Sequence, residues 1–300
     1  MPRKCFSCLE ENVFEVFVCP MSQEPILISI DSVSKSYGPA NDGVLALQRV
    51  SLQVHAGEFV SLIGPSGCGK STLLKLIGDL LAPTEGRIAI RGRTPEESRQ
   101  ARECALVFQA PTLMEWRSIE RNIELPLEIL GLPRSQRRER SLELLDLIRL
   151  RDFSHRYPRE LSAGMQQQVA IARALAYHPS ILLMDEPFGA LDEMTRERLG
   201  RELLDIWEQA RVTILFVTHS VGEAVMLSDR VAVLTPRPGH VERVIDIDLP
   251  RPRLAETRES SRYNGLVREV RSALHLNGNG GRHPYLYRTS GSERKTGKAS

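Results

Sequence analysis

The sequence has no apolar run that approaches the ~20 residues a helix needs to span a bilayer. Its first residues also lack the basic-then-apolar order of a secretory signal. Charge of either sign is not in excess, because 40 Lys and Arg residues face 38 Asp and Glu residues. Nothing in the composition therefore favours nucleic acid or an anionic membrane surface as a partner. These absences predict a protein of the cytosol.

Cysteine is scarce, with five residues at positions that do not suggest a disulfide framework. Cys5, Cys8 and Cys19 offer three thiolate ligands for zinc, but no second Cys or His pair follows at a zinc-ribbon spacing. The alternative is an unstructured extension over the first twenty residues, with Met21 as the functional beginning. We expect the extension. We also expect the polar, glycine-rich residues 277–300 to form a disordered tail.

Apolar segments alternate with amphipathic ones through the rest of the 300 residues. Residues 26–30 and 50–54 predict two strands of a small antiparallel layer. Later strands of continuous apolar residues, separated by helices, predict a parallel sheet covered on both faces. Residues 118–156 have apolar positions at helical spacing, with Pro126 and Pro133 as breakers, and predict a separate helical subdomain.

One segment matches the phosphate-binding pattern G-x-x-x-x-G-K-[ST] at every fixed position, between a predicted strand and a predicted helix. Glycines let backbone N–H groups converge on phosphate oxygens, and the helix N-terminus faces the same charge. In this pattern Lys70 reaches the β and γ phosphates, and the Ser71 hydroxyl binds Mg²⁺. The predicted nucleotide-binding residues are Gly64, Pro65, Ser66, Gly67, Cys68, Gly69, Lys70, Ser71 and Thr72.

Two adjacent carboxylates end the apolar segment 181–184. Hydrolysis of a γ-phosphate needs a held metal ion and an oriented water molecule. We therefore predict that Asp185 holds Mg²⁺ and that Glu186 is the catalytic base. An Asp-Glu pair after a strand is also a common helix N-cap, which is the structural alternative.

A phosphate loop alone does not separate a kinase, a GTPase, a helicase and a transporter motor. The segment Leu161–Met165, at the start of a predicted helix, resembles the signature Leu-Ser-Gly-Gly-Gln of ABC-type ATPases, with Ala163 and Met165 as departures. The resemblance implies an α/β P-loop fold with an antiparallel β subdomain and an inserted helical subdomain. It also implies a homodimer in which Ser162, Ala163 and Gly164 bind the ATP held by the other subunit.

Four more residues resemble functional positions of that family. The resemblance implies that Gln109 ligates Mg²⁺ and senses a membrane partner, that Asp192 crosses the dimer interface, and that His219 hydrogen-bonds the γ-phosphate. It implies that Tyr37 stacks on adenine. The structural alternatives are a surface glutamine, a turn into the next helix, a structural histidine and a surface tyrosine.

The chain also has a narrower resemblance to the ATPase subunits of nitrate, sulfonate and taurine importers, a branch that includes pyrimidine-precursor systems. This resemblance rests on Met165 and on the segments 115–117, 188–195 and 236–253. It implies an ATPase peripheral to the cytoplasmic face of the membrane, with permease subunits and, indirectly, a solute-binding protein as partners. The rival is a soluble ABC-type ATPase acting on nucleic acid or ribosomes, which the near-neutral charge disfavours. The expected boundaries are 1–24 for the extension, 25–250 for the ATPase domain with a helical subdomain at about 115–160, 251–276 for a C-terminal helical extension, and 277–300 for the tail.

Overall fold

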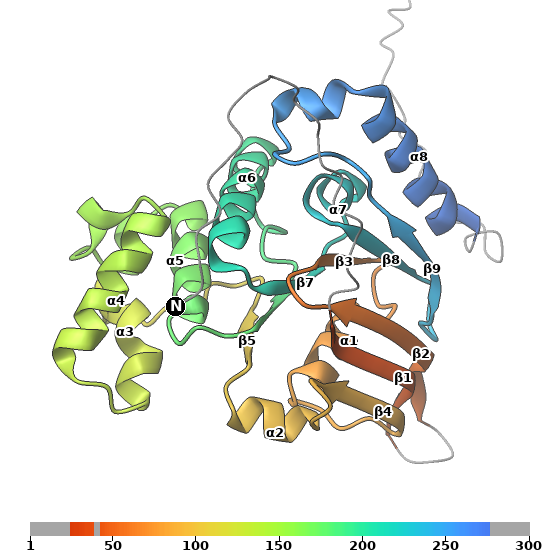
Figure 1. Cartoon of the computed structure of the whole chain (residues 1–300), viewed down its shortest axis with the longest axis horizontal. Helices are drawn as coiled ribbons and strands as arrows, with labels where there is room; N and C mark the ends of the chain where they lie inside the picture. The colour runs from red at the N-terminus through yellow and green to blue at the C-terminus, as the bar shows by residue number, and fades with distance from the viewer. Residues whose placement is uncertain (1–24, 39–42, 277–300) are drawn as a thin grey trace, which may run out of the picture.

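The computed structural model describes residues 25–38 and 43–276 (Figure 1). The predictions for 1–24, including the zinc alternative at Cys5, Cys8 and Cys19, and for 277–300 lie outside the described residues. None of the helices in the described ranges combines the length and the apolar character that crossing a membrane requires.

The predicted antiparallel layer is present as a three-stranded sheet, in the order β2-β1-β4. Its strands are β1 (Ile26–Tyr37), β2 (Val44–His55) and β4 (Glu85–Ile90). The strand β1 runs well past the expected end at residue 30, because register shifts between Ile30 and Val33 absorb its polar residues, with Ser32 at a φ of 49°. Such a bulge is invisible to a test for strict alternation.

The second sheet of the described chain has the order β5-β6-β7-β3-β8-β9. Its strands are β3 (Phe59–Ile63), β5 (Cys104–Val107), β6 (Ile181–Asp185), β7 (Thr213–Val217), β8 (Arg230–Leu234) and β9 (Val241–Asp246). The first five strands in this order pair in parallel, as predicted, whereas β9, a strand that was not predicted, runs antiparallel to β8 at the edge of the sheet. The sequence of β9 does not read as a buried strand, because three of its six residues are exposed and polar.

Both faces of the parallel sheet are covered, as predicted. Along β6, Ile181 and Leu183 pack into a core with the helix α1 and the antiparallel sheet, whereas Leu182 and Met184 pack into a second core with α5 and α6. The period of two in side-chain direction explains the continuous apolar sequence of the strand. The helices are α1 (Lys70–Ile77), α2 (Pro95–Gln100), α3 (Ile119–Ile129), α4 (Arg134–Leu147), α5 (Ala163–Leu175), α6 (Glu193–Ala210), α7 (Val221–Leu227) and α8 (Ser261–Leu276).

Helices α3 and α4 lie to one side of the sheet beside α5, while α8 lies at the other end, against α7, β8 and β9 (Figure 1). The prediction that Pro126 breaks a helix is wrong, because Pro126 lies inside α3. Buried Ile123 and Leu127 hold α3 in its place despite the missing N–H. Pro133 does mark a boundary, since it caps the N-terminus of α4.

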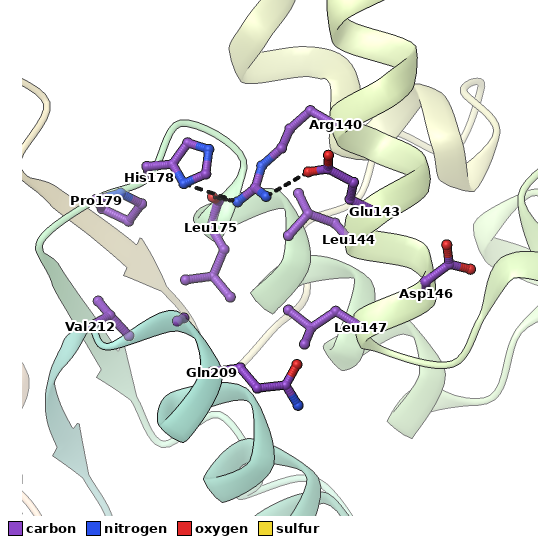
Figure 2. Close-up of a pocket in the computed structure, with 11 residues that line it drawn as sticks. Arg140, Glu143, Leu144, Asp146, Leu147, Leu175, His178, Pro179, Gln209 and Val212 are labelled. Carbon is purple, nitrogen blue, oxygen red and sulfur yellow. Dashed lines mark hydrogen bonds and ion pairs between the residues drawn. The ribbon is translucent and has the colours of Figure 1, made fainter. Parts of the chain in front are cut away.

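Arg140 of α4 attaches this helical region to the core (Figure 2). Its guanidinium donates to the carbonyl oxygens of Leu175 at 3.1 Å and Ala176 at 3.3 Å, at the C-terminal end of α5, and pairs with Glu143 at 3.0 Å. A cavity of about 630 Å³ opens beside it. Val212, which lies just before β7, lines that cavity. The cavity therefore lies at the amino ends of the strands, away from the phosphate loop.

Candidate nucleotide and hydrolysis site

The phosphate loop connects the carboxyl end of β3 to α1 at the centre of the sheet. Gly69 precedes α1 with a φ of 102°, and a Cβ there would lie 2.5 Å from Leu47 Cδ2. Only glycine fits both the conformation and the space. Lys70 is 5% exposed, and its ammonium donates to the carbonyl oxygens of Gly64 at 2.8 Å and Pro65 at 3.0 Å, which closes the loop around its own cation.

Two of the three predicted metal ligands, Ser71 and Asp185, meet although they come from different segments. The Ser71 hydroxyl, in the first turn of α1, donates to Asp185 Oδ1 at the end of β6 over 2.7 Å. Both groups present the hard oxygen atoms that Mg²⁺ prefers. No group of three or more His, Cys, Asp or Glu side chains that could hold a metal ion occurs within the described ranges. The pair therefore fits an ion that takes its remaining ligands from phosphate and water, as Mg²⁺ does in nucleotide sites.

Glu186 and His219, from the ends of neighbouring strands, are also brought together. Glu186 Oε2 lies 3.2 Å from His219 Nδ1, and the Glu186 backbone has a φ of 47°, held by its N–H bond to the Val217 carbonyl at 3.0 Å. Gln109, at the end of β5, approaches the same point, since a Cβ on Gly189 would lie 3.1 Å from Gln109 Nε2 and 3.5 Å from Glu186 Oε2. Three strand ends thus bring a carboxylate, an imidazole and an amide to one edge of the sheet.

Asp192 is placed differently from these residues. It is the N-cap of α6, and its Oδ1 accepts the Thr195 N–H at 3.0 Å. This bond holds the pKa of the Asp192 carboxyl below its usual value. The structural alternative, a turn into the next helix, describes what Asp192 does within its own chain. Its role at a dimer interface stays a prediction.

A cavity of about 310 Å³ lies over the phosphate loop. Tyr37 is 41% exposed at its edge, with its hydroxyl 3.2 Å from Thr72 Oγ1, so the ring is available for a base. Sequence reasoning missed three lining residues, Val44, Ala46 and Arg237. Arg237 was visible as part of the segment 236–239, but nothing in that segment indicated proximity to the loop. The lining residues are Tyr37, Val44, Ala46, Ser66, Gly67, Gly69, Lys70, Ser71, Thr72, Glu186 and Arg237.

The signature segment lies outside this cavity. Ser162 caps α5, and its hydroxyl accepts the Met165 N–H at 3.3 Å, while Ala163 and Gly164 form the first turn. Two residues further along α5 bind the segment that follows β5. Gln167 donates to the Phe108 carbonyl at 3.1 Å and Arg173 to the Pro111 carbonyl at 2.8 Å. Sequence reasoning did not single out these two, which link the signature helix to the loop that carries Gln109.

A phosphate loop after a central parallel strand, with an Asp-Glu pair at the end of a nearby strand, defines a P-loop nucleotide hydrolase. A family model described as ABC transporter matches residues 47–189. An uncharacterised ABC transporter ATP-binding protein of Methanocaldococcus jannaschii is 46% identical over 228 residues, 76% of this chain and 85% of that protein. The chain belongs to the ABC transporter ATP-binding family and is an ATPase.

Relatives named for import are also similar. The taurine import ATP-binding protein of Rhizobium johnstonii is 45% identical, covering 77% of this chain and 90% of that protein. An aliphatic sulfonates import protein of Bacillus cereus and a nitrate import protein of a Synechocystis strain are each 43% identical, over 78% and 74% of this chain and 90% and 83% of their own lengths. A solved ATP-binding cassette, dimeric and bound to ADP and phosphate, is 35% identical with a TM-score of 0.65, covering 75% of this chain and all of that one. The fold class and the ATPase family predicted from the sequence are confirmed.

Proposed function

We propose that this protein is the ATP-hydrolysing subunit of an importer for a small anion or sulfonated solute such as nitrate, an alkanesulfonate or taurine. The observation that carries the proposal is the 43–45% identity to import ATP-binding proteins over three quarters of the chain. The near-neutral charge gives no support to the rival function on nucleic acid.

Each residue of the site has a proposed role in hydrolysis. Lys70 and the loop N–H groups bind the phosphates, and Ser71, Asp185 and Gln109 would hold Mg²⁺, which neutralises charge on the phosphate oxygens when bound. Glu186 accepts the proton of the attacking water, and His219, 3.2 Å from it, orients that carboxylate and contacts the γ-phosphate. Tyr37 stacks on adenine.

We further propose that two copies form the working unit. In each copy Ser162, Ala163 and Gly164 would bind the nucleotide held by the other, at a helix N-terminus suited to an anion. Asp192 would lie at that interface. The dimeric state of the solved cassette supports this arrangement.

The helical region is the proposed contact with permease subunits at the cytoplasmic face of the membrane. Trp116 is 75% exposed and Ile129 is 77% exposed. Their chain neighbours Arg117 and Glu128 form an ion pair at 2.7 Å, so Trp116 and Ile129 lie near each other on the surface. Exposed large apolar side chains around one point are typical of an interface. A solute-binding protein would deliver the solute to the permease.

Reconstitution tests the proposal. The protein is assembled in liposomes with the permease encoded beside it, and ATP hydrolysis is measured with the neighbouring binding protein loaded with taurine, an alkanesulfonate or nitrate. We expect one solute to stimulate hydrolysis and the Glu186→Gln variant to show no stimulation. Stimulation by RNA or ribosomes instead, or absence of a complex with the permease, would contradict importer function while leaving the ATPase intact.

A further inference from the structure

The turn between β8 and β9 lies directly against the phosphate loop. Gly239 donates its N–H to the Ala46 carbonyl at 2.9 Å, and its own carbonyl accepts the Gln48 N–H at 2.9 Å, which ties the turn to β2. A Cβ on Gly239 would lie 1.9 Å from the Cys68 carbonyl oxygen, so the turn touches the loop backbone itself. No side chain larger than hydrogen fits between the two segments.

The turn is internally braced. The Thr235 N–H donates to the His240 carbonyl at 3.0 Å, and the His240 N–H donates to Thr235 Oγ1 at 3.0 Å. Pro236 and Pro238 flank Arg237 and restrict the backbone on both sides of it. These bonds and the two prolines therefore hold the backbone of Arg237 in a fixed position beside the phosphate loop.

Arg237 lines the same cavity as the phosphate loop and Tyr37. Among the described contacts its guanidinium has no hydrogen bond and no ion pair, whereas Arg230 and Arg243, on the strands either side of the turn, pair with Glu58 at 3.0 Å and Glu269 at 2.8 Å. A cation without a protein partner that faces a phosphate-binding cavity is suited to an anionic ligand.

We propose that Arg237 binds the phosphate chain of the nucleotide, as a second cation supplied by an element separate from the loop that carries Lys70. A guanidinium presents paired N–H donors that match two phosphate oxygens, and its charge adds to that of Lys70. The contact strengthens with the number of phosphates, so Arg237 favours ATP over AMP. This inference rests on the ATPase activity of the family and does not depend on which solute is imported.

The test compares Arg237→Gln and Arg237→Lys with the wild-type dimer by competition of ATP, ADP and AMP against a fluorescent nucleotide. We expect Arg237→Gln to weaken ATP binding about tenfold and AMP binding about twofold or less, because one charge-assisted contact to phosphate is lost. Arg237→Lys should fall between Arg237→Gln and the wild type, since it keeps the charge without the paired donors. The matched control is Arg87→Gln, which removes an equal charge from an exposed position of β4 and should leave all three affinities unchanged.

Equal losses for ATP and AMP would overturn the proposal, because they would place Arg237 on the base or the ribose. Unchanged ATP affinity in Arg237→Gln would overturn it as well. Thermal unfolding of each variant shows whether the fold is intact, and an exposed side chain on the turn should not alter it.

Discussion

At the scale of single residues, Glu186 occupies a conformation that glutamate rarely adopts, with a φ of 47°. Its backbone N–H bond to Val217 holds it there, and the carboxylate turns towards His219 as a result. A strained backbone conformation of this kind persists only where the surrounding structure holds it, and such conformations cluster at functional sites. The arrangement matches a residue whose task is to position a water molecule.

The first prediction concerns that carboxylate. Glu186→Gln should bind ATP with nearly unchanged affinity but hydrolyse it roughly 10²–10⁴-fold more slowly, because the amide keeps the shape of the side chain and cannot accept a proton. Phosphate release and ATP titration of the same preparation measure both quantities. Turnover within a few-fold of the wild type would remove Glu186 from the role of base.

Residues of the site were predictable from sequence where each lies in a motif of fixed spacing. The contact of Ser71 with Asp185 joins residues 114 positions apart, yet both were identified, because each ends or begins an element next to a recognisable loop. Arg237 was not identified as a site residue. Its approach to the phosphate loop depends on how the β8–β9 turn packs against β2, which no local pattern records.

At the scale of elements, Arg253 joins α7 to the segment after β9. Its buried guanidinium donates to the carbonyl oxygens of Val225, Met226 and Ser228 at the C-terminal end of α7, and to those of Ile247 and Leu249. Burial lowers the pKa of Arg253 to about 10, so it remains charged at neutral pH. A cation at a helix C-terminus satisfies carbonyls that have no partner within the helix.

We predict that Arg253→Ala lowers the free energy of unfolding by about 3 kcal/mol or more, because several buried carbonyl oxygens lose a charged donor at once. Chemical denaturation measures the change. Arg253→Lys should recover part of the loss. A change under about 0.5 kcal/mol in Arg253→Ala would mean that water replaces the guanidinium without cost.

Glu223 of α7 contacts Thr218, the residue that precedes His219. It accepts the Thr218 hydroxyl hydrogen bond, and Arg196 Nε of α6 lies 3.3 Å from its Oε1. Burial raises the pKa of Glu223, opposed by Thr218 and by the charges of Arg196, His219 and Arg258. A raised native pKa means that the native state holds this proton more tightly than the unfolded state does.

The stability contributed by Glu223 should therefore be complete below its unfolded-state pKa and should decline as pH rises through the native value. Glu223→Gln lacks this decline, so its melting temperature relative to the wild type should rise as pH increases from about 4.5 towards neutrality. Thermal unfolding across that range tests it, with Glu208→Gln, an exposed glutamate of α6, as the control. A constant difference between variant and wild type would contradict the burial argument.

Physical causes explain why the sequence did not reveal α2 and why Pro126 was taken for a helix breaker. The short α2 has a capping box between Thr94 and Glu97 with Pro95 after the cap, a readable signal, but its polar sequence gives no apolar period. Pro126 was predicted to end a helix because proline removes a backbone N–H locally. Packing of α3 on α4 and α5 nevertheless keeps the helix continuous. Local capping therefore forms α2, whereas tertiary contacts keep α3 continuous.

At the scale of the whole molecule, the signature residues and the phosphate loop belong to different surfaces. Ser162 starts α5, which adjoins the helical region, and it does not line the cavity over the phosphate loop. Gln167 and Arg173 fasten the same helix to the segment after Gln109. A displacement of the helical region would therefore carry the signature helix and the Gln109 segment together, which would connect the proposed permease contact to the hydrolysis site.

The last prediction follows from that separation. Lys70→Ala retains an intact signature and Ser162→Arg retains an intact phosphate loop, so each homodimer should be inactive while their heterodimer has one composite site with both halves sound. The heterodimer, isolated with two affinity tags, should hydrolyse ATP at about half the wild-type rate if the sites act independently, and more slowly if they are coupled.

A matched control carries the same two substitutions on one chain. The heterodimer of wild type with the Lys70→Ala, Ser162→Arg double variant has no site with both halves intact and should be inactive. Restored activity in the first heterodimer and not in the second would require that Ser162 act on the nucleotide of the opposite subunit. Full activity of Ser162→Arg alone, or activity in the second heterodimer and not in the first, would show that each subunit hydrolyses ATP without its partner's signature.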